Sequence, residues 1–357
     1  MLNFTVGPVM SDQEVLEVAS FSTPYFRTSE FSNIMFENEN MMLQLLNAPK
    51  DSRCVFLTSS GTGAMEACVM NVLNDMDKVL VINGGSFGER FVELCRFHNR
   101  DFTEIKLSFG EQIKEAHLEN YHQKGYSAFL VNMHETSSGT LYNMDLIAEF
   151  CKKNHITLIV DAISSFIADE LDMKKLGAAV VITGSQKALA VQPGIAIVAM
   201  SPDALARVNQ NKEKCYYFSL KEALKNGERG QTPFTPAVTV LLQINKRLRK
   251  ICEHGIEVER NKIVKNAKDF RDRIIDFPFE LVSENMSNAV TTLRHKSGNG
   301  AKEIVRILKD EYQIWVCPNG GEKADEVFRV GHIGCIQEED NEKLIQALTD
   351  MKERNLL

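Results

Sequence analysis

The hydrophobic pattern of the first 200 residues predicts a series of short, buried strands. Apolar runs rich in β-branched residues recur at 54–59, 78–83, 102–107, 128–133, 156–161, 179–184 and 195–200. Most of the stretches between the first five runs carry apolar residues at helical spacing, as in Gly63–Leu73, Phe87–His98 and Met144–Lys153. This alternation predicts an α/β fold with a large, mostly parallel seven-stranded sheet and helices on both of its faces.

The last two predicted strands are connected differently from the others. Only a segment around Lys187 and the pair Pro193-Gly194 separate 179–184 from 195–200. A connection between parallel strands needs a longer crossover, usually a helix. One of these two strands is therefore expected to run antiparallel.

After about residue 235 the pattern changes to that of a smaller C-terminal α+β domain. A long helix is predicted from Thr235 to His254, ending at Gly255, and a second helix follows through Ile274. Further strands and helices are predicted at 289–294, 301–312, 314–317, 327–330 and 338–354. We expect a large domain at 12–245 and a small domain at 246–357, which also includes 1–11.

The composition is that of an ordinary globular protein. Of the 357 residues, 44% are hydrophobic and 25% are charged, and the formal net charge is −7. Because the basic residues are scattered, nucleic acid is not an expected partner. No apolar run approaches the roughly 20 residues that span a bilayer, and no signal segment opens the chain. We expect a soluble, cytoplasmic protein with no membrane partner.

The cysteines and histidines indicate neither a disulfide framework nor a metal site. The eight cysteines include no CxxC pair, and most lie within apolar patterns, as expected of core residues in a reducing compartment. The eight histidines show no HxxxH spacing. No bound metal is therefore expected.

A lysine and an aspartate follow two of the predicted strands. The run at 179–184 leads into Ser185-Gln186-Lys187, and the run at 156–161 ends on Asp161. Ligands of open α/β sheets bind at the carboxyl ends of the strands, where both groups are expected. The pair suits pyridoxal 5′-phosphate (PLP), since a lysine can form an imine with its aldehyde and an acid can keep its pyridine nitrogen protonated. Taken singly, Asp161 could be a helix cap and Lys187 a surface residue.

Two glycine-containing turns are candidates for binding the rest of this cofactor. Ser60, Gly61 and Thr62 open a predicted helix, whose free N–H groups and hydroxyls suit a phosphate ester. Phe87 follows the next strand and could cover one face of a pyridine ring. As alternatives to cofactor binding, the Ser60-Gly61-Thr62 turn could be an ordinary capped turn, and Phe87 could be a residue of the core.

Two further polar features follow or interrupt apolar strands. The cluster His134-Glu135-Thr136-Ser137-Ser138 could hydrogen-bond the cofactor hydroxyl or a substrate, with no role assigned to His134. Arg329 lies between apolar neighbours, where an unpaired guanidinium would be costly. It either pairs with a structural carboxylate or grips the α-carboxylate of a substrate.

Together these motifs resemble those of fold-type I, class V aminotransferases, along nearly the whole chain. The resemblance rests on 3–8, Ser60-Gly61-Thr62, 135–139, 160–165, 184–189 and 328–331. It implies the PLP-dependent transferase fold, catalytic roles for Lys187 and Asp161, and cofactor contacts from Ser60, Gly61, Thr62, Phe87, Thr136 and Gln186. It also implies that Arg229 and Thr232 reach the cofactor phosphate of the neighbouring subunit, in a homodimer with shared active sites.

Different segments of the chain resemble two different subfamilies of these aminotransferases. Residues 185–189 resemble alanine–glyoxylate and serine–pyruvate aminotransferases, whereas 230–236 and the Ser-Gly-Thr turn resemble 2-aminoethylphosphonate–pyruvate aminotransferase. The implied reaction is a ping-pong transfer from alanine, serine or 2-aminoethylphosphonate to pyruvate or glyoxylate. Arg27 could bind a distal anionic group or form a surface salt bridge, and Phe26 departs from the histidine that is frequent in the family.

Two alternatives remain open at this stage. A cysteine desulfurase or another PLP-dependent lyase would need a reactive cysteine, and desulfurases carry a histidine before the PLP lysine. Gln186 occupies that position here, and Cys317 and Cys335 have no special sequence context. The other alternative is a PLP-binding protein without catalytic activity.

Overall fold

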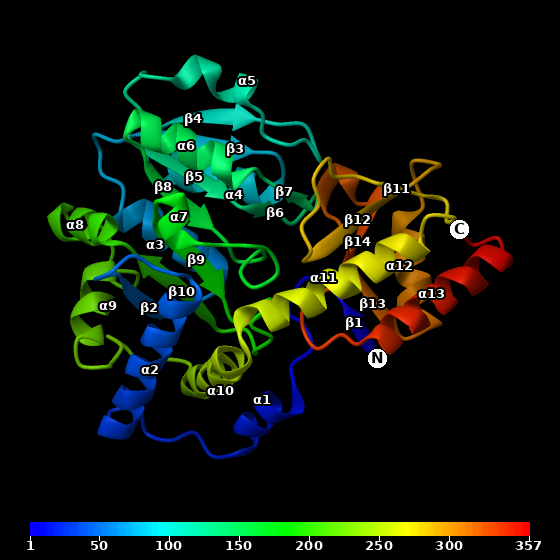
Figure 1. Ribbon diagram of the computed structural model, residues 1–357, viewed down its shortest axis with the longest axis horizontal. Helices are drawn as coiled ribbons and strands as arrows, with labels where there is room; N and C mark the ends of the chain where they lie inside the picture. Colours follow the sequence, from blue (N-terminus) through cyan, green and yellow to red (C-terminus); the bar gives the residue numbers. More distant parts are fainter.

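A computed structural model describes residues 1–357 and contains two main β-sheets (Figure 1). The larger sheet has seven strands in the order β2-β10-β9-β8-β5-β3-β4. All neighbouring strands are parallel except β10, which runs antiparallel to β2 and β9, as predicted for one of the last two strands. Their bounds are β2 Arg53–Thr58, β3 Lys78–Asn83, β4 Asp101–Lys106, β5 Ala128–Asn132, β8 Thr157–Asp161, β9 Ala178–Gly184 and β10 Ile195–Met200.

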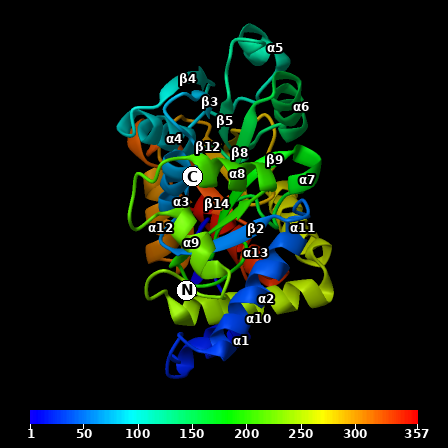
Figure 2. The same ribbon diagram turned by 90° about the vertical axis from the view of Figure 1, so that its left-hand side faces the viewer.

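Helices cover both faces of this sheet because the side chains of each strand alternate between two cores. In β8, Leu158 and Val160 belong to one apolar cluster, whereas Ile159 belongs to the other. The first cluster includes side chains of α2 (Ser29–Leu45), α6 (Met144–Asn154) and α10 (Val238–His254). The second is covered by α3 (Gly61–Asn71), α4 (Ser86–Phe97), α8 (Pro202–Gln210) and α9 (Leu220–Gly227), as Figure 2 shows from the side.

The smaller sheet has five strands, in the order β1-β13-β14-β12-β11, and its own apolar core. The first strand of the chain joins it, because β1 (Leu2–Phe4) pairs in parallel with β13 (Ile314–Pro318). The helix α11 (Ile256–Arg273) reaches from the larger core to the smaller one (Figure 1). The remaining elements of this part are β11 Phe279–Leu281, β12 Val290–His295, α12 Ala301–Asp310, β14 Val327–Gly331 and α13 Glu338–Glu353.

A short hairpin of β6 (His134–Glu135) and β7 (Thr140–Leu141) lies where the two sheets meet. Thr140 bridges to Met286, and the N–H of Leu141 donates to the carbonyl of Asn285 at 2.9 Å. This hairpin therefore links the carboxyl end of β5 to the segment that enters the smaller sheet.

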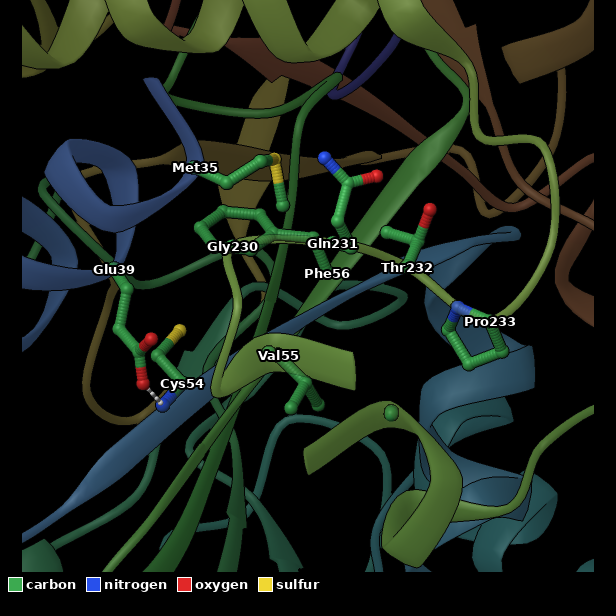
Figure 3. Close-up of a pocket in the computed structure, with 11 residues that line it drawn as sticks. Met35, Glu39, Cys54, Val55, Phe56, Gly230, Gln231, Thr232 and Pro233 are labelled. Atoms are coloured by element: carbon green, nitrogen blue, oxygen red, sulfur yellow. Dashed lines mark hydrogen bonds between the residues drawn. The ribbon is translucent and has the colours of Figure 1, made fainter. Parts of the chain in front are cut away.

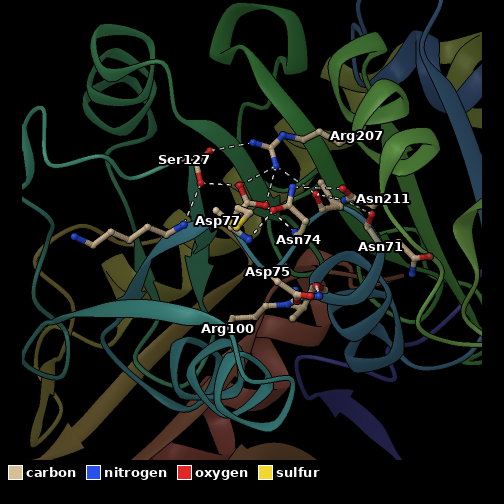
Figure 4. A network of polar contacts seen from close by, with 12 residues as sticks. Asn71, Asn74, Asp75, Asp77, Arg100, Ser127, Arg207 and Asn211 are labelled. Carbon is tan, nitrogen blue, oxygen red and sulfur yellow. Dashed lines mark hydrogen bonds and ion pairs between the residues drawn. The ribbon is translucent and has the colours of Figure 1, made fainter.

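Charged groups at the amino end of the larger sheet are internally paired (Figure 4). Nη1 of Arg207 contacts both carboxylate oxygens of Asp77, at 3.0 and 3.1 Å, and Ser127 donates to the same carboxylate at 2.6 Å. Arg100 donates to Asp75 at 2.9 Å. Paired charges of this kind indicate a structural network.

Some elements were not predicted from the hydrophobic pattern. These include the long helix α2, the helices α8 and α9, and the edge strands β1 and β11. Short helices lie at α1 Gln13–Glu17, α5 Glu115–Leu118 and α7 Met173–Leu176. None of the helices combines the length and the hydrophobicity that a membrane span requires. The domain limits proposed above stay a prediction.

Candidate active site

Lys187 and Asp161 lie together at the carboxyl edge of the larger sheet. The strands that lead to them, β9 and β8, are adjacent and parallel, with Asp161 opposite Ile182. Both side chains are buried, with exposed fractions of 8% for Lys187 and 5% for Asp161. Each charge shifts the pKa of the other group, which places the amine and the carboxylate in one electrostatic environment.

Asp161 keeps one oxygen available for a ligand. Its Oδ1 accepts a hydrogen bond from the N–H of Ile163 at 2.8 Å, and its Oδ2 has no partner within the chain. Burial raises the pKa of this carboxyl to about 6, although the Ile163 N–H and the nearby Lys187 both act to lower it. A cationic group placed against Oδ2 would stabilise the ionised form.

Lys187 has no ion-pair partner, and its pKa is lowered. Burial lowers the pKa of the amine to about 8, and the positive charge of Arg329 is the second cause. Its aliphatic stem packs against Gly7, where an added Cβ would lie 2.8 Å from Cδ of Lys187 and φ is +125°. Glycine is therefore required at position 7, and the amine is held at the end of a confined stem.

The predicted phosphate turn opens α3. Ser60 is the N-cap residue, but its side chain makes no capping hydrogen bond, so the first-turn N–H groups have no side-chain acceptor. A Cβ at Gly61 would lie 2.3 Å from Cδ1 of Ile163. The hydroxyl of Thr62 accepts a hydrogen bond from Nη1 of Arg90 at 3.2 Å. The turn is therefore an open donor site with a cation beside it.

The turn that carries Phe87 is held by a buried carboxylate. Oε2 of Glu135 accepts hydrogen bonds from the N–H groups of Phe87 and Gly88, at 3.1 and 3.0 Å. Glu135 also accepts from the backbone N–H of Ser137 and from Nδ2 of Asn132, both at 3.0 Å, and is not exposed. The carboxylate at the start of α4 therefore fixes the aromatic residue relative to the β6–β7 hairpin.

Arg329 is buried without a carboxylate partner. Its Nη1 donates to the carbonyl of Thr136 at 3.1 Å and its Nη2 to the carbonyl of Pro318 at 2.6 Å. The hydroxyl of Thr136 lies 2.7 Å from that of Ser164, which is close to Asp161 in the chain. The structural alternative for Arg329, an ion pair with a carboxylate of the chain, does not occur.

Three consecutive carbonyls of the hairpin turn receive hydrogen bonds from residues of the smaller sheet and its loops. Arg329 in β14 donates to Thr136, as described above. Asn319, after β13, donates to the carbonyl of Ser137 at 3.1 Å, and Ser283, after β11, donates to that of Ser138 at 2.6 Å. These contacts set the position of the Arg329 strand relative to Lys187.

Three other predicted site residues, Arg229, Thr232 and Arg27, do not meet Lys187 within the chain. Arg229 is exposed, with its Nη2 bonded to Asn226 at 2.7 Å. Thr232 lines a pocket between α2 and the edge strand β2 (Figure 3). The guanidinium of Arg27 donates to the carbonyls of Thr232 and Pro233. Gln186, by contrast, directly precedes Lys187; it is half-buried, and its carbonyl accepts a hydrogen bond from the N–H of Val9.

Sequence reasoning missed two residues of this region and gave a third no separate role. Arg90 and Asn319 carry no motif, and only their contacts reveal them. Glu135 was expected only as a member of the polar cluster 134–138, although a carboxylate so close to the end of a buried strand is a signal that could have singled it out. His134 is buried without partners, and burial lowers its pKa to about 3, so the ring is neutral.

Comparison with known proteins shows the family. Residues 16–326 match the family model of class V aminotransferases, and the chain belongs to this family. An aminotransferase from Methanocaldococcus jannaschii is 30% identical over 94% of this chain and 88% of the relative. The L-aspartate–glyoxylate aminotransferase of Paracoccus denitrificans is 26% identical over 93% of this chain and 86% of its own length. The solved alanine–glyoxylate aminotransferase of Nostoc sp. has a TM-score of 0.92, with 24% identity, and 98% of this chain and 95% of that structure are covered.

The chain is thus a PLP-dependent aminotransferase, and its residues fit this cofactor. An unpaired buried amine, an aspartate oxygen without a partner and open N–H donors at α3 are the groups that an aldehyde, a pyridine nitrogen and a phosphate require. The predicted fold type I is confirmed by the arrangement of the two sheets and by the solved structures.

Proposed function

We propose that this aminotransferase moves the amino group of a small amino acid to glyoxylate or pyruvate, in two half-reactions at the Lys187 site. The observation that carries the proposal is the guanidinium of Arg329, which is buried beside Lys187 without a carboxylate partner. The α-carboxylate of an amino or keto acid would pair with it through charge-assisted hydrogen bonds. The Paracoccus relative named above acts on glyoxylate, which supports the choice of acceptor.

The proposed roles follow from the positions of the side chains. Bound PLP supplies an electron-accepting ring. Lys187 would hold its aldehyde, Asp161 would keep its pyridine nitrogen protonated, and the α3 turn would hold its phosphate. Once released by the donor amino group, the Lys187 amine carries a proton from the substrate Cα, and its lowered pKa keeps a useful fraction neutral near pH 8. Thr136, Gln186 and Phe87 complete the proposed cofactor site.

The donor proposed is an α-amino acid such as alanine or serine. The guanidinium of Arg329 matches an α-carboxylate, and because a guanidinium also pairs with phosphonate oxygens, 2-aminoethylphosphonate stays a candidate donor. Arg27, the residue considered for a distal anion, already donates to Gln231 and to two backbone carbonyls. A role for Arg27 in substrate binding therefore stays a prediction.

We also propose a homodimer with shared active sites in the cytoplasm. Arg229 and Thr232 lie apart from Lys187 in their own chain, as expected if they serve the partner's site. The exposed rings of Tyr216 and Tyr217 pack against Phe234 in the same region, with centroid distances of 5.4 and 5.2 Å, and such exposed aromatic groups favour a protein interface. All eight cysteines are free, which supports a reducing compartment.

The cysteine desulfurase alternative is disfavoured by its two candidate thiols. Cys335 donates to Asp12, and burial raises the pKa of its thiol to about 11, which lowers its reactivity. Cys317 is fixed within β13, opposite Arg329, and not on a mobile loop.

The function is tested by single half-reactions with purified, PLP-loaded protein. Each of alanine, serine, glutamate, aspartate and 2-aminoethylphosphonate is added alone, and the visible absorbance of the cofactor is followed. We expect bleaching with alanine or serine, and recovery on addition of glyoxylate or pyruvate. If none of the donors bleaches the cofactor, transamination of small amino acids is wrong. Borohydride should attach the cofactor to wild-type protein but not to Lys187→Ala.

A further inference from the structure

Arg90 connects the two segments that the sequence indicates for cofactor binding. It lies in the first part of α4, and its guanidinium carbon is 4.9 Å from the centroid of the Phe87 ring. Its Nη1 donates to the hydroxyl of Thr62 at 3.2 Å. One side chain therefore contacts both the aromatic residue and the opening turn of α3.

The charge of Arg90 has no carboxylate partner. Two other arginines that are at least partly buried are paired with carboxylates, Arg207 with Asp77 at 3.0 Å and Arg247 with Glu259 at 2.6 Å. The positive charge of Arg90 is among the causes that lower the pKa of Lys187 and oppose the rise in the pKa of Asp161. It is thus an uncompensated cation at the edge of the active site.

We propose that Arg90 binds the phosphate ester of PLP from within the same chain. This inference rests on the proposed site at Lys187. A phosphate held by the Thr62 hydroxyl and the N–H groups of α3 would be adjacent to the guanidinium, which suits phosphate oxygens because it offers several donors in one plane. The dianion would supply the counter-charge that Arg90 lacks. Stacking on Phe87 keeps the guanidinium in position before the cofactor arrives.

The experiment compares ligands with and without the phosphate. Apo-protein is titrated by calorimetry with pyridoxamine 5′-phosphate and with pyridoxamine, neither of which can form an imine with Lys187. In Arg90→Gln we expect the affinity for pyridoxamine 5′-phosphate to fall about 10- to 100-fold, the range for charge-assisted hydrogen bonds. The affinity for pyridoxamine should stay unchanged. Arg96→Gln, which alters an exposed arginine of the same helix, should leave both affinities unchanged.

The possible outcomes separate the inference from the proposed function. Equal loss for both ligands would show that Arg90 acts only through Phe87, and no loss for either would reject a phosphate contact. If wild-type protein binds neither ligand, the proposed cofactor site fails as well. Thermal unfolding of each apo-variant checks the fold. Should Arg90→Gln not fold, Arg90→Lys keeps the charge without the planar fork, and a selective loss for the phosphorylated ligand is again expected.

Discussion

Nη1 of Arg329 donates a hydrogen bond to the carbonyl of Thr136 at 3.1 Å, across the junction of the two sheets. This contact joins the proposed substrate-binding residue in β14 to the hairpin that also carries Glu135. Because Glu135 holds the backbone of Phe87, the substrate and cofactor sides of the site share one support. Cations without an ion-pair partner occur at the carboxyl ends of the strands of the larger sheet, whereas the charges at the amino ends are paired.

Substitution of Arg329 should weaken substrate binding selectively. Arg329→Gln removes the cation proposed to pair with the α-carboxylate, so kcat/KM for alanine and for pyruvate should fall about 10- to 100-fold. Single-turnover kinetics of each half-reaction measures this. The control Arg306→Gln alters an exposed arginine of α12 and should have no effect. Wild-type kinetics in Arg329→Gln would contradict the assignment.

The reactivity of Lys187 should depend on pH as its lowered pKa requires. Covalent capture of PLP by the apo-protein needs the neutral amine, so the capture rate should rise with a midpoint near pH 8, well below the value of about 10.4 for an ordinary lysine. Borohydride trapping at a series of pH values gives the midpoint. A midpoint near 10 would show that the amine is neither buried nor affected by Arg329.

Replacement of Asp161 should stabilise the apo-protein while it impairs catalysis. The pKa of this carboxyl is raised to about 6 in the folded state. Its favourable contribution to the free energy of unfolding is therefore complete below the pKa that the group has in the unfolded chain, and it is lost as the pH rises through 6. Asp161→Asn can still accept from Ile163 and carries no buried charge. The unfolding temperature of Asp161→Asn minus that of the wild type should therefore be larger at pH 7.5 than at pH 5.

The same variant should lose transamination activity, because an amide cannot keep the pyridine nitrogen protonated. A constant difference in unfolding temperature between pH 5 and pH 7.5 would contradict the raised pKa. Retained activity would contradict the functional role.

Shared active sites should allow complementation between defective subunits. Lys187→Ala and the double variant Arg229→Ala/Thr232→Ala should each be inactive or weakly active. In a mixed dimer both defects fall in one site, and the other site is intact. After random exchange of subunits, roughly one quarter of all sites should be wild type. Activity that does not recover on mixing would show that Arg229 and Thr232 serve their own chain.

Much of the larger sheet could be predicted because its signal is local. The strands Lys78–Asn83 and Ile195–Met200 match their predicted bounds, since continuous apolar runs mark strands that are buried on both faces. The helix α2 was missed because polar residues interrupt its apolar pattern. Asn38 and Glu39 are buried there, and they bond to Leu241 and Arg53, which are distant in the chain. No local pattern reveals such partners.

The proximity of Lys187 and Asp161 was likewise predictable, because parallel strands in a doubly wound sheet place their carboxyl ends at one edge. The order of residues therefore decided the type of fold, the cofactor and the two groups expected to act on it. The absence of a carboxylate beside Arg329, the place of Arg90 between Thr62 and Phe87, and the support that Glu135 provides were decided only by folding. Each depends on contacts between side chains whose separation in space is not encoded by any local periodicity.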